Sequence, residues 1–94
     1  MSPRTIVPPI LYFPVVPGAD PTQQQFVVRR LTDGRDGLLA YTALDRLATN
    51  CGDDQPWVLL PIEQLERIKQ AQPFDVVAFD LVVPPDQRRG KRIA

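Results

Sequence analysis

Residues 37–52 constrain the fold most, because they combine a strand, a helix start and a helix end within sixteen positions. The strand is the short apolar run at residues 38–41. Thr42, followed three positions later by Asp45, is a variant of the capping box with Asp in place of the usual Glu. Gly52 can take the left-handed turn that ends a helix. One helical face carries the apolar residues at the spacing i, i+3, i+4, i+7, namely Leu44, Leu47, Ala48 and Cys51.

The remaining patterns predict five strands and two helices in the order β-β-β-α-β-α-β. The predicted strands are residues 10–16, 25–31, 38–41, 57–60 and 74–83, and the predicted helices are residues 42–51 and 61–72. We expect the first three strands to form an antiparallel meander, and each later β-α-β unit to form a parallel pair with a right-handed crossover. Pro14 favours an edge position or a bulge for the first strand. The predicted fold is a single α+β domain with a mixed five-stranded sheet and two helices packed mainly on one face.

Apolar side chains on both sides of the strands predict a binding surface. Residues 10–16, 25–31 and 74–83 all carry apolar side chains on two faces, and two helices on one face would leave the other uncovered. A second copy of the chain, giving a homodimer, or another protein would cover it. Tyr12 and Trp57 are candidate interaction residues, although Trp57 also suits core packing with a polar tip at the boundary.

Asp80 is a further candidate interaction residue, because it shares a strand face with apolar residues. It would serve either as a recognition carboxylate or as a strand-end carboxylate paired with Arg29 or Arg30. Two other acidic pairs, at residues 33 and 36 and at residues 53 and 54, fall in turns, where Asp is favoured because its side chain bonds the local backbone.

Charge is distributed unevenly although the 11 basic and 11 acidic residues cancel. An extended leader (residues 1–9) precedes the α+β domain (residues 10–83), and a basic tail predicted to be disordered (residues 84–94) follows it. The basic side chains of the tail are Arg88, Arg89, Lys91 and Arg92. Such a run can contact nucleic acid phosphates. It also suits solubility or docking to an acidic protein surface, so a nucleic-acid-associated accessory protein is the alternative function.

The composition excludes most common catalytic chemistry. The chain has no histidine and one cysteine, which removes Ser-His-Asp and Cys-His arrangements, a standard zinc site and an internal disulfide. No glycine-rich phosphate loop or dinucleotide fingerprint is present. We therefore expect no cofactor, no metal and no enzymatic activity. A pocket joining Asp80 and Arg30 would instead favour an enzyme that works with carboxylates or arginines alone.

The chain start and its hydropathy predict a cytoplasmic protein. The first residues lack the continuous apolar core of a signal peptide. No apolar run approaches the ~20 residues that a membrane span needs. Cys51, on the apolar face of the first helix, is expected to be a small core residue.

Three segments resemble the amino-terminal domain of the SseB-like proteins, named for enhanced serine sensitivity, and their small relatives in GC-rich bacteria. The segments are residues 11–15 (LYFPV), residues 37–47 (GLLAYTALDRL) and residues 57–65 (WVLLPIEQL). The resemblance covers residues 10–82, with Ala43 at a place where Ser or Asp is often seen. It implies an α+β domain without established catalytic residues.

Overall fold

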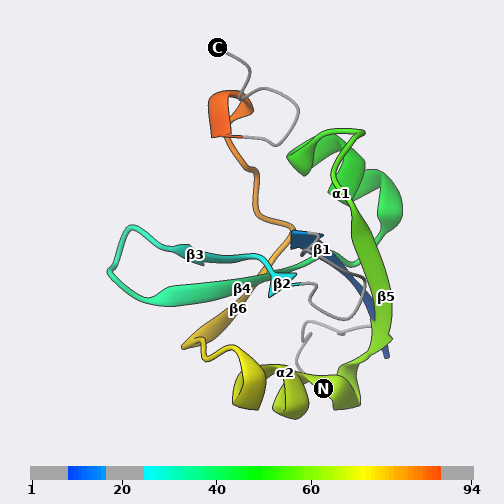
Figure 1. The fold of residues 1–94 in the computed structure, drawn as a ribbon. Helices are drawn as coiled ribbons and strands as arrows, with labels where there is room; N and C mark the ends of the chain where they lie inside the picture. Colours follow the sequence, from blue (N-terminus) through cyan, green and yellow to red (C-terminus); the bar gives the residue numbers. More distant parts are fainter. Residues whose placement is uncertain (1–8, 17–24, 88–94) are drawn as a thin grey trace, which may run out of the picture.

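The computed structural model describes residues 9–16 and 25–87 (Figure 1). These ranges hold six strands: β1 (Ile10–Val16), β2 (Gln25–Phe26), β3 (Val28–Arg30), β4 (Asp36–Ala40), β5 (Trp57–Pro61) and β6 (Val76–Phe79). They also hold the helices α1 (Leu44–Cys51) and α2 (Leu65–Ala71) and the 3-10 turns η2 (Ile62–Gln64) and η3 (Pro85–Gln87). A small α+β domain is thus confirmed.

The strands form two three-stranded sheets, in the orders β2-β1-β5 and β3-β4-β6, so the predicted single five-stranded sheet is wrong. The difference arises at Val27, where the predicted strand 25–31 divides. The Val27 N–H donates to the carbonyl oxygen of Pro14 in β1 (3.2 Å), and its carbonyl accepts from the Leu39 N–H in β4 (3.0 Å). The chain therefore leaves one sheet and enters the other at this residue.

The two sheets also meet at a bridge between Tyr12 and Tyr41. Each residue donates its N–H to the other's carbonyl oxygen, at 2.9 and 2.8 Å. Parallel pairing occurs only once among the described strands, between β4 and β6. The predicted parallel pairing of β5 is wrong, since β5 runs antiparallel beside β1 in the other sheet.

Pro14 lies in a central strand, contrary to the predicted edge or bulge, because β1 is flanked by β2 and β5. The N–H that Pro14 lacks would point away from β5. On this other side, two different segments lie beside β1. On that side Tyr12 bonds Tyr41, and the Val15–Val16 end pairs with β2. Proline removes one ladder donor, and the carbonyl oxygen that this donor would face, that of Val27, accepts from the Leu39 N–H of β4 instead.

The two helices pack on opposite faces of β4, so the prediction that both lie mainly on one face is wrong. Figure 1 shows α1 above β4 and α2 below it. Alternate residues of β4 serve the two sides, as the period of a strand requires. Leu38 and Ala40 pack with Ile68 of α2, whereas Leu39 packs with Leu47 of α1.

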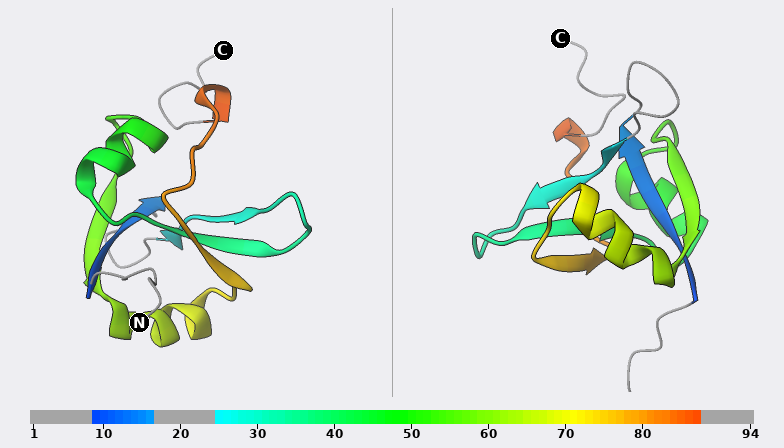
Figure 2. Two further views of the ribbon diagram at one scale, coloured as in Figure 1. Left: turned by 180° about the vertical axis from the view of Figure 1, so that it is seen from behind. Right: turned by 60° about the horizontal axis from the view of Figure 1, so that its bottom comes forward.

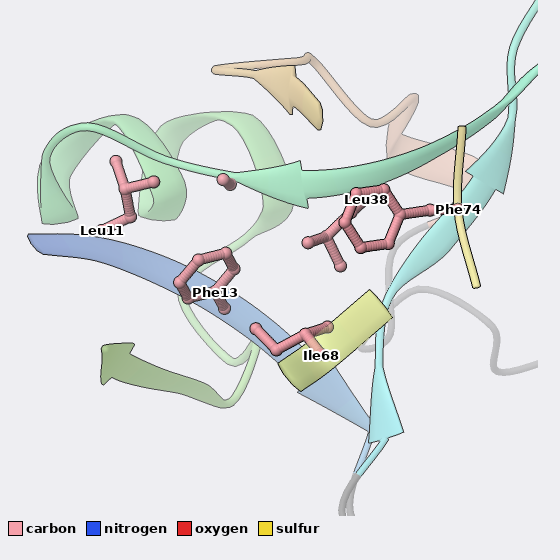
Figure 3. Packing of buried hydrophobic residues seen from close by; sticks show 6 residues of the cluster. Leu11, Phe13, Leu38, Ile68 and Phe74 are labelled. Carbon is pink, nitrogen blue, oxygen red and sulfur yellow. The ribbon is translucent and has the colours of Figure 1, made fainter. Parts of the chain in front are cut away.

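Two hydrophobic clusters result from this arrangement. Figure 3 shows the larger cluster, into which side chains point from β1, β4, α2 and the segment after α2, namely Leu11, Phe13, Leu38, Ile68 and Phe74. The smaller cluster joins α1 to β4 and the segment after β6 through Leu39, Tyr41, Leu47, Cys51 and Val83. Apolar residues on both strand faces are therefore largely covered from within the chain.

The start of α1 differs from the predicted capping box. Ala43 occupies the N-cap position, and no side-chain hydrogen bond caps the helix. Thr42 instead donates its hydroxyl to Asp80, which lies 38 positions away. At the other end Gly52 adopts φ 107° and ψ 150° and donates its N–H to the Ala48 carbonyl oxygen. Glycine tolerates this positive φ better than any other residue does. The predicted left-handed turn is not formed, because ψ lies outside the left-handed helical region.

A side-chain amide holds the short strand β2. Gln72, directly after α2, accepts the Phe26 N–H through Oε1 (3.0 Å) and donates Nε2–H to the Phe26 carbonyl oxygen. This amide takes the place of a neighbouring strand. Because β2 has only two residues, the bond pair fixes the point at which the chain crosses between the sheets.

Most of the predicted leader and tail lies outside the described residues. Pro9 is the only described leader residue, and η3 falls within the first part of the predicted tail. No helix within the described ranges is long and apolar enough to cross a membrane.

Candidate functional site

Strand β5 presents the most accessible apolar surface along a sheet edge. It lies at the margin of the fold in both views of Figure 2. Val58 and Leu60 turn inward and pack against the larger cluster. Trp57 and Leu59 turn outward and are 40% and 47% exposed. The alternation is that of a half-buried strand, but the exposed positions carry large apolar side chains in place of polar ones.

Two residues of β1 extend this outward surface, because they stand opposite β5 in the antiparallel register. Tyr12 pairs with Leu59, and Ile10 pairs with Pro61. The ring of Tyr12 meets Trp57 edge to face, with 5.3 Å between centroids. We call the four side chains Ile10, Tyr12, Trp57 and Leu59 the outer patch. None of the four carries a charge, so the outer patch is suited to an apolar contact.

The structure brings the predicted candidates Tyr12 and Trp57 together but exposes them unequally. Tyr12 is half-buried and packs against the smaller cluster, so it supports the ring of Trp57 more than it meets solvent. Ile10 and Leu59 were missed by the sequence reasoning. The alternation of residues 57–61 in the sequence could have placed Leu59 on the same face as Trp57. Ile10 could not have been found this way, because its position depends on the register between β1 and β5.

No other described strand pairs with the outer edge of β5, which we call the free edge, and this edge carries main-chain hydrogen-bonding groups. The Val15 N–H donates to the Pro56 carbonyl oxygen (2.9 Å), and the Ile62 N–H donates to the Pro9 carbonyl oxygen (2.8 Å). Main-chain groups alternate in direction along a strand. The N–H and C=O groups of Val58 and Leu60 therefore face β1, and those of Trp57 and Leu59 face away from it. Four polar groups thus line the free edge.

The other edge strands are protected against pairing in the usual ways, which are short length and charge. Strand β2 has two residues, and β3 has three, of which Arg29 and Arg30 are charged. Strand β6 has four residues and lies between Asp75 and Asp80. Strand β5 has five residues and no charge, and Pro61 at its end is its one protective feature. Among the described strands, β5 is the least protected edge.

Asp80 lies away from the outer patch and ties β6 to the start of α1. Its carboxylate accepts the Thr42 N–H (3.0 Å), the Thr42 hydroxyl (2.9 Å) and Nη1–H of Arg46 (3.0 Å). Asn50 donates to its main-chain carbonyl oxygen (3.1 Å). Asp80 also adopts a positive φ of 55°, which Asp tolerates better than most residues.

The electrostatics of Asp80 follow from these contacts. Burial disfavours its carboxylate, but the hydrogen bonds from Thr42 and the pairing with Arg46 outweigh burial and lower its pKa. The predicted pairing with Arg29 or Arg30 is wrong. Arg30 pairs with Asp36 at 2.6 Å, and Arg29 donates to Gln87. All three acceptor contacts of the carboxylate are thus within the fold, which is the arrangement of a structural tie.

The basic candidates Arg88, Arg89, Lys91 and Arg92 lie outside the described residues. The nucleic-acid alternative that depends on them stays a prediction from the sequence.

Two of the cavities in the described part of the chain adjoin the sheets. One of about 140 Å³ is mainly apolar and is lined by residues including Val27, Leu39 and Cys51, with Arg29 among its polar members. The other is lined by residues 29–33 with Leu81 and Val82, so it contains Arg30 without Asp80. Neither of these two cavities joins Asp80 to Arg30, which is the arrangement that would have favoured an enzyme.

The buried polar groups beside the first cavity are engaged in structural contacts. The Cys51 thiol donates to Tyr41 Oη (3.0 Å), and the Tyr41 hydroxyl donates to the Leu81 carbonyl oxygen (2.5 Å). Burial raises the pKa of Tyr41 above its ordinary value, so the phenol stays protonated. Within residues 9–16 and 25–87, no three Cys, Asp or Glu side chains gather as metal ligands would.

Neither protein-family models, nor curated proteins, nor solved structures yield a match to this chain. The resemblance to the SseB-like proteins accordingly stays a prediction from the quoted segments.

Proposed function

We propose that this domain is a non-enzymatic protein-interaction module that binds through the free edge of β5 and the outer patch. The observation that carries the proposal is the conjunction of two features on one strand. Trp57 and Leu59 expose their side chains, and the same two residues direct their main-chain N–H and C=O groups away from β1. A partner strand added to such an edge gains main-chain hydrogen bonds and side-chain contacts together.

Both faces of β4 are covered by helices of the same chain, which reduces the surface to which a partner could bind. Since α1 and α2 occupy opposite sides, a partner is not needed to cover an open sheet face. The edge of β5 remains, and proteins usually shorten or charge an edge that must stay unpaired. The engagement of Asp80, Tyr41 and Cys51 in structural contacts supports the non-enzymatic part of the proposal.

Co-purification tests this function. The full-length chain carrying a tag is recovered from its own cells after nuclease treatment, together with a second copy carrying a different tag. We expect the wild type to be recovered with a protein in stoichiometric amount, which is either the second tagged copy or another protein. The Leu59→Lys variant should be recovered without that protein, because an edge lysine opposes strand addition. Val82→Lys is the matched control, since Val82 is 60% exposed and lies outside both sheets.

Equal recovery of the partner by Leu59→Lys and the wild type would contradict the proposed surface. If no protein accompanies the chain, and nucleic acid is recovered when nuclease is omitted and lost when residues 88–94 are deleted, the module would be contradicted and the basic tail favoured. Binding through phosphate contacts would also weaken as salt rises.

A further inference from the structure

We infer that the occupant of the β5 edge is a second copy of this chain, which adds its own β5 antiparallel to the first around a two-fold axis at Val58. This inference rests on the proposed function, because it uses the same surface and names its partner. The sheet β2-β1-β5 would then continue through the axis into the same sheet of the second copy, giving six strands.

The hydrogen-bonding groups of the edge are complementary to themselves in this register. An axis at Val58 places Trp57 opposite Leu59 of the second copy, and Leu59 opposite its Trp57. Each such pair exchanges two bonds in an antiparallel ladder. All four outward groups of Trp57 and Leu59 are then bonded in each chain, which gives four bonds across the axis.

Each neighbouring register leaves an outward main-chain group of Trp57 or Leu59 without a partner. An axis at Leu59 would set Trp57 opposite Pro61, which has no N–H, so the Trp57 carbonyl oxygen would lack a donor. An axis at Trp57 would set Leu59 opposite Gln55, whose N–H already donates to the Gly52 carbonyl oxygen (3.3 Å). An unmade main-chain bond is costly where water is excluded. The Val58 register is therefore favoured over both.

Charge and side-chain chemistry also suit a second copy. The register places the ring of Trp57 beside Leu59 of the other chain, on the outer face where both are exposed. Strand β5 carries no charge, and the chain has a formal net charge of zero, so two copies do not repel as a whole. The exposed carboxylates flanking the strand, Asp54 and Glu63, approach across the axis and oppose pairing only weakly.

The strength of the contact follows from its size. Stable complexes bury about 800 Å² on each partner. Four main-chain bonds and two aromatic–aliphatic contacts fall short of that area. A dimer in the micromolar range is therefore expected, and raised salt should leave it intact or strengthen it slightly by screening the flanking carboxylates.

Sedimentation and amide exchange of the full-length chain test the inference together. Sedimentation from low to high micromolar concentration should show a monomer–dimer equilibrium. Leu59→Lys should raise its dissociation constant about tenfold or more, whereas Val82→Lys should leave it unchanged. Amide exchange of the wild type should slow at Trp57 and Leu59 as the dimer forms, with Val58 and Leu60 unaffected, because their amides already face β1.

Each other result overturns the inference in a distinguishable way. A clean monomer at high micromolar concentration would show that the occupant of the edge is not a second copy. If a different protein accompanies the wild type on co-purification and is absent from Leu59→Lys, the proposed interaction module is supported with that protein as its partner. A dimer whose Trp57 and Leu59 amides exchange at the monomer rate places the contact elsewhere. A cooperative urea unfolding transition with the same dependence of the unfolding free energy on urea as in the wild type establishes that the lysine variants are folded.

Discussion

Replacing Asp80 should destabilise the domain, because its carboxylate ties two segments that are 38 positions apart. Hydrogen bonds to a charged group contribute about 1.5–3 kcal/mol each. The two from Thr42 fall at the low end of that range, since the Asp80 side chain is 21% exposed. The pairing with Arg46, whose side chain is 60% exposed, adds less than about 1 kcal/mol. Asp80→Ala should therefore cost about 3 kcal/mol.

Asp80→Asn should cost less, about 1 kcal/mol, because the amide oxygen still accepts the Thr42 N–H and Asn tolerates a positive φ. Urea unfolding at neutral pH measures both losses, with an unchanged dependence on urea showing that the unfolded state is the same. Asp54→Asn is the matched control, since Asp54 is exposed in a loop. A loss below about 1 kcal/mol for Asp80→Ala would refute the assigned role.

The acid dependence of stability tests the same contact independently. The pKa of Asp80 is lower in the folded chain than in the unfolded chain. Its stabilising contribution is therefore present above the unfolded pKa of about 3.9 and is lost as pH falls through the folded pKa. Asp80→Asn should lose less stability than the wild type on acidification. If the unfolding free energy of Asp80→Asn and of the wild type fell identically with pH, the cause assigned to the lowered pKa of Asp80 would be contradicted.

Three further substitutions test the packing and the strand crossing. Gln72→Leu removes both the acceptor of the Phe26 N–H and the donor to the Phe26 carbonyl oxygen, so it should cost about 1–3 kcal/mol and speed amide exchange of Phe26; unchanged exchange would argue against the amide as a strand substitute. Leu11→Ala in the larger cluster should lower the free energy of unfolding by about 2–5 kcal/mol, measured by urea titration, against less than about 1 kcal/mol for the 46% exposed Ile10→Ala. Gly52→Ala forces a side chain onto φ 107° and ψ 150° and should cost about 1–3 kcal/mol; a thermal midpoint equal to that of the wild type would exclude strain there.

The candidate surface was partly predictable. Trp57 was identified from its type, because a large amphipathic ring on a short strand suits an interface as well as a core. Its exposure was not predictable, since exposure depends on whether another segment of the chain packs over that face of β5. The neighbouring Tyr12 and Ile10 join it only through the β1–β5 register.

Local patterns determined the elements of this protein. The apolar spacing of residues 44–51 reports a helix, and the run at residues 57–60 reports a strand, because side-chain period follows backbone geometry alone. The tertiary structure decided the rest: that the strand 25–31 divides at Val27, that Asp80 binds Thr42, and that α1 and α2 take opposite sides of β4. Periodicity shows that a face is apolar without showing which distant segment covers it, and that choice depends on the packing of the whole chain.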